Sequence, residues 1–312
     1  MQKLPKDIAL ALRPEVFPPA LEIRLARRID ESYKNVTHLF VPDIPRSFES
    51  LEIVTADLTV SQRLHVGPGV IRILEHDIEL LDRRISTLQS MFGNRFFLGV
   101  GVGSPGPNPA VKIDEMLKRT QALRDRLAKK SGHMKQTKTS EDHSIKLEIF
   151  VSALRAHMAR LGAEISDGLL LNFCSPNHVK RIVEFLGDRR KKVKLVCYLK
   201  VFFGRTNEEA ERLLAEEFVK YDKLPQYHRM FQEDRVAQDI HLLERNLALG
   251  ETSVPTSLKR ISMANPSHDE LAEYVENFRK AGVDLPCIYP YTNSSEDESF
   301  KEQIVEEAVE EI

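Results

Sequence analysis

The sequence predicts an α/β protein that folds as a (β/α)8 TIM barrel. Short apolar or β-branched runs alternate with longer segments of helical period, which is typical of βαβ units and a parallel sheet. Eight such runs occur, and a chain of 312 residues has the length of eight strand and helix units with insertions. An open doubly wound sheet would more often have fewer strands. We therefore expect residues 1–312 to form a single barrel domain.

The expected strands are the short runs themselves. Each has the length and composition of a strand, whereas the segments between them are longer and apolar at helical spacing. The runs are 7–12, 37–43, 64–71, 95–103, 146–153, 168–173, 194–203 and 286–292.

Amphipathic segments between these runs predict the helices. Leu21, Leu25 and Ile29 recur at near-helical spacing after the first run. A helix after the third run ends at Gly93, a common stop signal, and one after the seventh begins at Thr206 or Asn207 with acids in its first turn. The expected helices are 19–33, 76–92, 177–192, 206–221 and 269–282.

Three segments depart from the regular alternation. The polar segment 129–144 predicts a mobile insertion after the fourth strand. The long helical stretch 206–250 after the seventh strand is interrupted around Leu224 and Pro225, so we expect two consecutive helices there. The acidic end, 293–312, predicts a solvated tail or helix.

Composition and charge exclude several classes of function. With 45 basic and 47 acidic residues, no general attraction to nucleic acid or to an anionic membrane is expected. The three cysteines form no CxxC pair, which argues against a disulfide framework or a cysteine zinc site and fits a reducing cytoplasm. No stretch approaches the roughly 20 apolar residues of a membrane helix. We expect a soluble cytoplasmic protein with a small-molecule substrate.

The glycine-rich stretch 94–109 matches the spacing G-x-G-x-x-G at Gly101, Gly103 and Gly106. A dinucleotide-binding fold needs a helix to begin at the third glycine and an acid about 20 residues later at the end of a second strand. Prolines surround Gly106, so no helix can begin before about Ala110, and the residues near 125 are helical and basic. The dinucleotide interpretation is therefore disfavoured.

A second interpretation treats Gly99, Gly101 and Gly103 as alternate residues of a strand that face one side. Such glycines mark a place where a ligand or another backbone approaches closely, and at the C-terminal end of a barrel strand that place is the active-site mouth. The alternative is a tightly packed point in the barrel. In the third run, Gly67, Pro68 and Gly69 lie mid-strand, where a bulge is expected.

Several segments resemble the bacterial luciferase-like superfamily of flavin-dependent monooxygenases and deazaflavin-dependent reductases. They are VGPGVIRI (66–73), TLQSMFGNRFFLGVGVGSP (87–105), SDGLLLN (166–172), LPQYHRMF (224–231) and NPSHDELAEYVENFRKAGVDLPCIYPY (265–291). The likeness covers nearly the whole chain and is greatest to the coenzyme F420-dependent methylenetetrahydromethanopterin reductases. It implies a barrel with an insertion region, commonly a homodimer, whose flavin or deazaflavin ring lies at the C-terminal mouth of the strands.

The resemblance also implies which residues meet the ring. In this superfamily the third strand carries a bulge, in several members with a non-prolyl cis peptide, that backs the ring, and the fourth strand lies beside it. The expected ring contacts in this chain are Gly67, Pro68, Gly69, Val70, Gly99, Gly101 and Gly103.

Members similar to this chain hold the cofactor phosphate on the turn after the fifth strand. Backbone N–H groups at a helix N-terminus, with a hydroxyl and a guanidinium, suit an anion. Without the resemblance, Ser152 would be an ordinary N-cap and Arg155 a solvated side chain. The expected phosphate residues are Ser152, Ala153, Leu154 and Arg155, and the neighbouring wall is expected at Asn172, Phe173, Cys174 and Ser175.

The chain departs from the reductase pattern at three places. Ala11 stands where those reductases have an acid near the end of strand one, with Arg13 and Glu15 just beyond. Asp43 is followed by Ile44 rather than by histidine, and Asp77-Ile78 replaces the customary His-Pro. Asp43 is our candidate for a catalytic or ring-contacting group, because an acid at the end of a barrel strand faces the site. Alternatively it caps the following loop.

The resemblance leaves three functions open. The favoured one is hydride transfer between F420 and a small organic substrate, for which a pterin-linked one-carbon carrier is one option. An FMN-dependent monooxygenase is the second, because reduced flavin activates oxygen and a deazaflavin does not do so readily. A noncatalytic flavin-binding homologue is the third. His38, His65 and His76 do not share a metal-binding spacing, so no metal is predicted.

Overall fold

The computed structural model describes residues 7–103, 106, 108–134 and 147–310. Its strands include all eight of the expected runs and add a short one that contains residue 263. They are β1 (Ile8–Ala11), β2 (Val36–Val41), β3 (His65–Pro68), β4 (Ile71–Arg72), β5 (Phe97–Gly101), β6 (Glu148–Ser152), β7 (Gly168–Asn172), β8 (Lys194–Phe202), β9 (Met263–Ala264) and β10 (Leu285–Tyr291).

The predicted barrel is confirmed. The strands follow the order β3-β2-β1-β10-β8-β7-β6-β5-β4, and neighbours along this order pair in parallel. β3 and β4 are consecutive in the chain yet stand at the two ends of this order, so together they occupy the third position of the barrel. A parallel bridge from Val66 of β3 to Phe96, just before β5, closes the ring. The short β9 pairs with β8 outside the ring.

The third strand is interrupted at the expected bulge, and it contains the non-prolyl cis peptide that the resemblance implied. β3 ends at Pro68 and β4 begins at Ile71, and the peptide bond between Gly69 and Val70 is cis. Before the break the strand pairs with β2, and after it with β5. The backbone N–H of Gly69 still donates to the carbonyl of Val41, 2.8 Å away, so the chain stays in contact with β2 up to the break.

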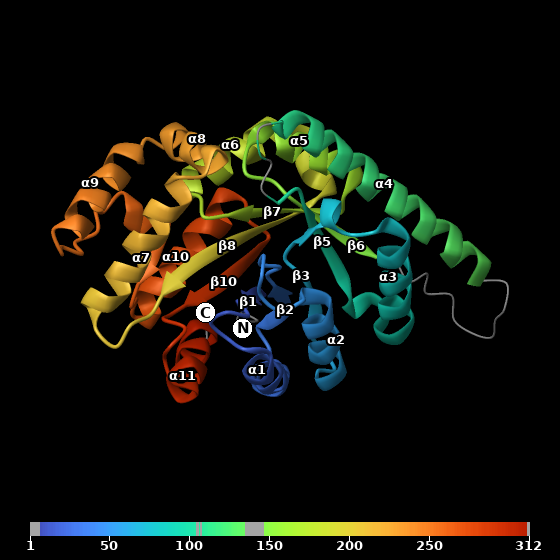
Figure 1. Ribbon diagram of the computed structural model, residues 1–312, viewed down its shortest axis with the longest axis horizontal. Helices are drawn as coiled ribbons and strands as arrows, with labels where there is room; N and C mark the ends of the chain where they lie inside the picture. The colour runs from blue at the N-terminus through green and yellow to red at the C-terminus, as the bar shows by residue number, and fades with distance from the viewer. Residues whose placement is uncertain (1–6, 104–105, 107, 135–146, 311–312) are drawn as a thin grey trace, which may run out of the picture.

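The helices surround the barrel (Figure 1). The five expected helices are all present. Four have bounds within two residues of the prediction, and the one expected at 177–192 is α-helical only to Leu186 and continues as a 3-10 helix over Gly187–Lys192. The described helices are α1 (Pro19–Ser32), α2 (Ser50–Val60), α3 (Ile78–Phe92), α4 (Pro109–Met134), α5 (Ala156–Ile165), α6 (Pro176–Leu186), α7 (Asn207–Asp222), α8 (Pro225–Glu233), α9 (Ala237–Ala248), α10 (His268–Ala281) and α11 (Glu298–Val309).

Two helical expectations need correction. The stretch after β8 is three helices rather than two, because the chain turns again at Arg235, whose φ of 61° ends α8 before α9 begins. The region 44–62, where none of the expected helices lay, contains α2, which the carboxylate of Glu49 caps by accepting from the N–H of Glu52. Leu51, Val54 and Leu58 bury the inner face of that helix.

The segment 129–144, expected as a mobile insertion, begins in a helix. Residues 129–134 continue α4, and 135–144 lie outside the described residues, so the insertion stays a prediction. α4 itself begins at Pro109, which agrees with the expectation that no helix could start before about residue 110.

The acidic end of the chain forms a packed helix, α11. Its buried face includes Ile304, Val305 and Ala308, and α11 lies beside α1 in Figure 1. Arg24 pairs with Glu298 at 2.5 Å. Acidic residues that were expected in a solvated tail or helix therefore contact the first helix. α11 thus covers the barrel next to β10 and β1.

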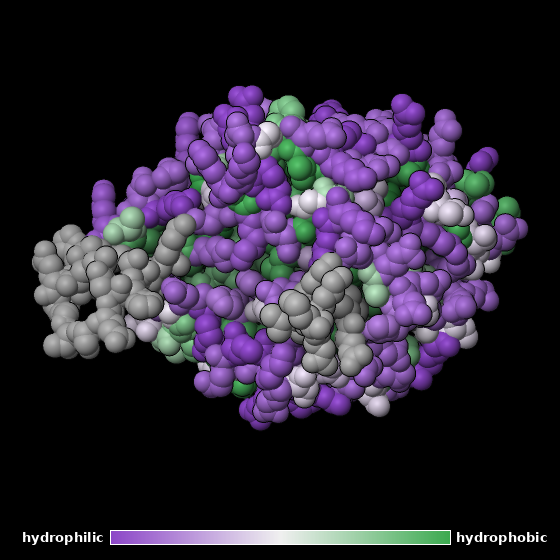
Figure 2. Space-filling model, turned by 180° about the vertical axis from the view of Figure 1, so that it is seen from behind, coloured by the Kyte–Doolittle hydropathy of each residue, from purple (hydrophilic) through white to green (hydrophobic). Residues whose placement is uncertain are grey.

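The core has two parts that alternate along each strand. On β8, Leu195, Cys197 and Leu199 pack outward against helices, whereas Val196 and Tyr198 belong to a cluster inside the barrel. This is the two-residue period of a strand that is buried on both faces. The outer surface is predominantly hydrophilic, as Figure 2 shows for one face. Within the described ranges, no helix is long and apolar enough to cross a membrane.

Candidate functional site

The candidate site lies at the C-terminal mouth of the barrel, where the inner face of each strand ends. Following the alternation from Tyr198 along β8 places Lys200 on the inner face, next to the end of the strand. The same alternation from Leu170 places Asn172 inward at the end of β7, and from Phe150 it places Ser152 inward at the end of β6. The mouth is therefore lined by polar side chains above an apolar barrel interior.

On the β3–β5 side, the glycines allow close approach of the chain to itself. A Cβ at Gly67 would collide with the carbonyl oxygen of Phe97, and one at Gly69 would collide with the hydroxyl of Tyr198. That hydroxyl donates to the carbonyl of Gly69, 2.9 Å away. The glycines of the broken third strand are thus required by contacts inside the barrel.

Gly99 and Gly101 bring β5 against this break. A Cβ at Gly99 would collide with the carbonyl oxygen of Pro68, and one at Gly101 would lie 2.6 Å from Cγ2 of Val70 and 2.7 Å from Oγ of Ser152. Val70 is partly exposed and packs against the inner cluster. The geometry supports close packing between strands, and contact of these residues with a ring stays a prediction.

Asp43 and Gly103 meet at one side chain, Arg72. The guanidinium Nε of Arg72 donates to Oδ2 of Asp43 at 3.2 Å, and its NH1 group pairs with Glu75 at 2.8 Å. Gly103 has a φ of 69°, and a Cβ there would lie 2.9 Å from Cγ of Arg72. The carboxylate of Asp43 is therefore held in an ion pair at the ends of β2 and β4, and its catalytic role stays a prediction.

The turn after β6 presents a helix N-terminus, as expected, but Ser152 is not its cap. Arg155 is the N-cap residue of α5, and its side chain makes no capping hydrogen bond. Its guanidinium instead pairs with Glu233 of α8 at 2.7 Å. The N–H of Ala153 is used by the sheet, donating to Leu170, and the carbonyl of Leu154 contacts Nε2 of His178 at 2.6 Å. An anion here would meet the first-turn N–H groups of α5.

The four residues expected at the end of β7 separate into two directions. The amide Nδ2 of Asn172 donates to the hydroxyl of Tyr227 at 2.8 Å, and Oδ1 of Asn172 is buried without a partner among the described residues. The ring of Phe173 packs on Phe218 of α7. Cys174 and Ser175 point away from the mouth. Only Asn172 of the four lines it.

Cys174 and Ser175 have structural contacts outside the barrel interior. The Sγ atom of Cys174 lies 3.7 Å from that of Cys197, and this contact together with burial raises the pKa of the Cys174 thiol. Ser175 caps α6 by accepting from the N–H of His178, and it lines a groove between α6 and α10.

The β8–β10 side of the mouth contains a buried ion pair that sequence reasoning missed. Nζ of Lys200 lies 2.6 Å from Oε1 of Glu217 on α7, and both side chains are 4% exposed. The ammonium also lies over the ring of Tyr221, 3.9 Å from its centre, and 5.5 Å from that of Tyr289. The alternation that places Tyr198 inside would have placed Lys200 there, and a lysine inside a buried strand is unusual enough to notice.

The pair is charged in the folded protein. Burial alone would raise the pKa of Glu217, but the ammonium of Lys200, with Lys220 and Arg13, outweighs burial and lowers that pKa to about 2. Burial would lower the pKa of Lys200, but Tyr221 and Glu217 outweigh it and raise that pKa. Arg13, which follows β1, lies 3.8 Å from Glu217 and over the ring of Tyr291. These groups form a charged network under α7.

A protein family model described as luciferase-like monooxygenase matches residues 31–285. Solved structures with similar folds include an F420-dependent secondary alcohol dehydrogenase in complex with an F420-acetone adduct, with a TM-score of 0.68, 14% identity and 99% of each chain covered. The coenzyme F420-dependent tetrahydromethanopterin reductase from Methanopyrus kandleri has a TM-score of 0.68, 15% identity and 99% of each chain covered.

A flavin enzyme is also similar. The oxygenating constituent of 3,6-diketocamphane monooxygenase from the CAM plasmid of Pseudomonas putida, in complex with FMN, has a TM-score of 0.65 at 14% identity, with 98% of each chain covered. At these identities the likenesses show the fold. They include F420-dependent and FMN-binding proteins alike, so they do not distinguish between the two cofactors.

Proposed function

The chain belongs to the luciferase-like monooxygenase family, and from this membership we propose that it is an oxidoreductase that transfers a hydride between coenzyme F420 and a small organic substrate. Two structures of the same fold, which it matches over 99% of its length, are F420-dependent by their descriptions. One acts on a secondary alcohol and the other on a pterin. A pterin-linked one-carbon carrier is accordingly the first substrate class to test, with secondary alcohols the second.

The observation that carries the proposal is the unpartnered Oδ1 of Asn172 at the mouth. A buried carbonyl-type oxygen without a hydrogen bond is costly unless a ligand supplies the donor. The pyrimidine edge of a deazaflavin or flavin ring carries an N–H, which makes such a ring a fitting donor. Val70, which covers Gly99 and Gly101, offers a partly exposed apolar side chain for the face of such a ring.

The phosphate end of the cofactor fits the start of α5. The first-turn N–H groups there have no side-chain cap, and the helix dipole favours an anion at that end. Ser152 adds a hydroxyl beside them. Arg155 is held by Glu233, so it contributes a guanidinium in a defined place rather than a free side chain.

When bound, the deazaflavin supplies the hydride chemistry, and the protein supplies binding, orientation and exclusion of water. In our proposal Asn172 orients the ring, Val70 supports its face and the α5 N-terminus holds the phosphate. The charged network of Arg13, Lys200 and Glu217 lies where the substrate would approach from the β8–β10 side. Asp43, paired with Arg72, is the candidate for a polar contact at the opposite rim.

Titration with oxidised F420 and with FMN, followed by absorbance and fluorescence, tests this proposal. We expect F420 to bind, and Asn172→Leu to bind it about tenfold less tightly because a buried hydrogen bond to the ring is lost. Tyr227→Phe removes the other hydrogen bond of Asn172, and Asn177→Leu makes the same change on the exposed surface of α6. Both should retain most of the affinity. Binding of neither cofactor would sink the redox proposal.

The second candidate is an FMN-dependent monooxygenase, which the similar FMN-bound structure favours. Binding of FMN alone, with oxygen consumption after reduction, would select it. Binding of either cofactor without turnover of any tested substrate would select a noncatalytic homologue, which the departures at Ala11, Ile44 and Asp77 favour. A homodimer and a cytoplasmic location stay predictions, and light scattering of the purified protein tests the first.

A further inference from the structure

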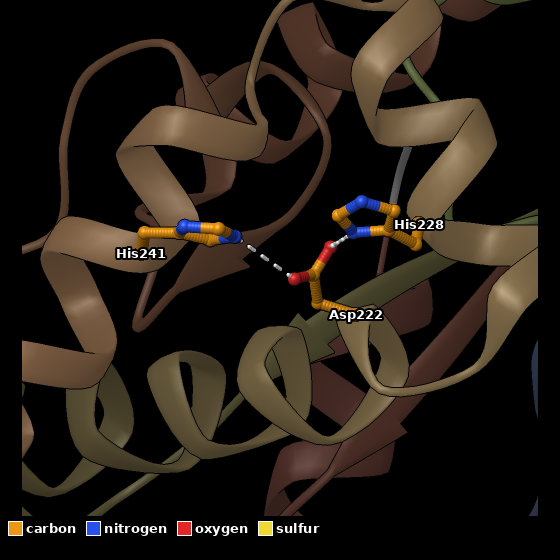
Figure 3. A group of neighbouring side chains, drawn as sticks. All are labelled: Asp222, His228 and His241. Atoms are coloured by element: carbon orange, nitrogen blue, oxygen red, sulfur yellow. Dashed lines mark hydrogen bonds and ion pairs between the residues drawn. The ribbon is translucent and has the colours of Figure 1, made fainter.

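Three side chains from three consecutive helices converge on the outer side of the α7–α9 segment. Asp222 is the last residue of α7, His228 lies in α8 and His241 lies in α9. Figure 3 shows both imidazoles turned toward the carboxylate of Asp222, which lies between them. Their sequence spacing matches no metal motif, so only the packing of the helices brings them together.

The nitrogen and oxygen atoms that face one another are close enough to share a ligand. Nδ1 of His228 lies 2.9 Å from Oδ1 of Asp222, and Nε2 of His241 lies 3.5 Å from Oδ2. One ligand atom from each residue lies within 4.8 Å of the others. The two rings are nearly parallel, with an interplanar angle of 22° and centres 6.3 Å apart. Both therefore present an edge to the same small volume.

We propose that Asp222, His228 and His241 bind a divalent transition-metal ion, best matched by Zn²⁺, that links α7, α8 and α9. Zinc is bound by histidine nitrogen and carboxylate oxygen at about 2.0–2.2 Å, so tetrahedral ligand atoms lie roughly 3.3–3.6 Å apart. Side-chain rotations that close the widest separation by about 1 Å would reach that geometry. Water supplies the fourth position, since three protein ligands leave it open.

A second contact supports a ligand role for His228. The side-chain amide of Gln232, one turn along α8, lies 2.8 Å from Nε2 of His228. When Nδ1 binds a metal, Nε2 carries the proton and needs an acceptor, which the amide oxygen of Gln232 provides by a flip of the amide. Ligating histidines usually have such a partner for the other ring nitrogen.

The donor set selects the class of metal. Two imidazoles and one carboxylate suit zinc, iron(II), copper or nickel, whereas Mg²⁺ and Ca²⁺ prefer sites made of oxygen. The place of the three ligands indicates a structural role for the metal, which does not depend on which cofactor the barrel binds. Tyr221 and Tyr227, which are next to Asp222 and His228 in the chain, contact Lys200 and Asn172 at the mouth. A metal that holds the three helices together would therefore also hold Tyr221 and Tyr227 in place at the mouth.

Calorimetric titration of the tag-free, chelator-treated full-length protein with ZnCl2 tests the proposal. We expect one equivalent to bind, a raised melting temperature and, with Co²⁺ as probe, the visible absorption of a tetrahedral site. His241→Ala and Asp222→Asn should each weaken zinc binding at least tenfold, and His241 is exposed enough that its loss leaves the fold intact. MgCl2 should give none of these changes.

The matched control is His268→Ala. His268 is also an exposed histidine, with Asp269 at 3.6 Å, but it does not belong to a three-residue cluster within the described residues. This variant should bind zinc as the wild type does. Zinc should also slow hydrogen exchange in α8 and α9 of the wild type but not of His241→Ala. Absence of zinc binding, or equal binding by wild type and His241→Ala, would overturn the site.

Discussion

The two sides of the barrel mouth are built by different means. On the β3–β5 side, glycines allow backbone and neighbouring side chains to meet, as where Gly101 lies against Val70 and Ser152. On the β8–β10 side, the space is filled by charged and aromatic side chains, chiefly Lys200 and Glu217. The first side depends on the absence of side chains, and the second on a charge balance between a strand and the helix that follows it.

This difference predicts different responses to mutation. A buried ion pair holds two charges away from water, so removal of one partner leaves the other uncompensated. A larger residue in place of a glycine overlaps a neighbouring atom, so the loss of stability depends on whether that atom can move. Each of the following experiments breaks one side while leaving the other as a reference.

The largest effect is expected from Glu217→Ala. It leaves the ammonium of Lys200 buried and unpaired, and we expect the free energy of unfolding to fall by about 3–5 kcal/mol, measured by urea denaturation. Glu211→Ala on the same helix removes the partly exposed partner of Lys259 and should cost less than about 1 kcal/mol. The double substitution Lys200→Met with Glu217→Leu should recover most of the loss. Failure of that recovery would show that the charges themselves are not the cause.

Low pH should also weaken the β8–β10 side of the mouth, because it protonates Glu217. The folded-state pKa of Glu217 is about 2, below its ordinary value of 4.5, so the unfolded state takes up the proton first as the pH falls. The pair therefore stabilises the fold fully above about pH 4.5 and loses this contribution toward pH 2, on the order of 3 kcal/mol. Unfolding curves from pH 6 to 2.5 should fall more steeply for wild type than for the Lys200→Met, Glu217→Leu variant. Parallel curves would contradict this account.

On the glycine side, Gly67→Ala should be the more destabilising of two matched changes. Its new methyl group meets the carbonyl oxygen of Phe97, a backbone atom that cannot rotate away. We expect a loss of about 1–3 kcal/mol in the free energy of unfolding. Gly101→Ala meets only side-chain atoms of Val70 and Ser152, so its loss should be smaller. A larger loss at Gly101 than at Gly67 would argue against this distinction.

Gly101→Ala should have the smallest effect on stability of these variants but a clear effect on cofactor binding. Gly101→Ala pushes Val70 and Ser152 toward the mouth, and we expect about tenfold weaker cofactor binding, equivalent to about 1.4 kcal/mol. Adding Val70→Ala should relieve the overlap with Val70 and restore part of the stability. Titration with F420 and thermal unfolding of the same samples measure both quantities. Equal losses in binding and folding would assign Gly101 to packing alone.

Local sequence patterns predicted most of the fold. The eight strands were recognisable because each is a short apolar run between helical segments, and this pattern does not depend on distant residues. α2 was missed because Ser50 and Asp57 are buried on it, which obscures its apolar face. The turn at Arg235 was missed because nothing in its composition resembles the proline that marks the preceding break.

The placement of candidate residues was predictable only at strand ends, and their role in a site stays a prediction. Ser152 and Asn172 lie at the mouth, as expected from their positions after buried runs. Cys174 and Ser175 come next in the chain, yet they turn outward, because Phe173 has a φ of 53° and Ser175 begins α6. A turn of this kind changes the direction of the following side chains without a change in composition.

By itself, the sequence determined the barrel, the eight strand positions and the places where glycine allows close approach. These follow from strand period, chain length and the small size of glycine, all of which are local properties. Only the tertiary structure decided that Glu217 balances Lys200 and that Asp222, His228 and His241 come together. Those contacts depend on how α7, α8 and α9 pack, and packing between helices is set by the whole fold rather than by the spacing of the residues.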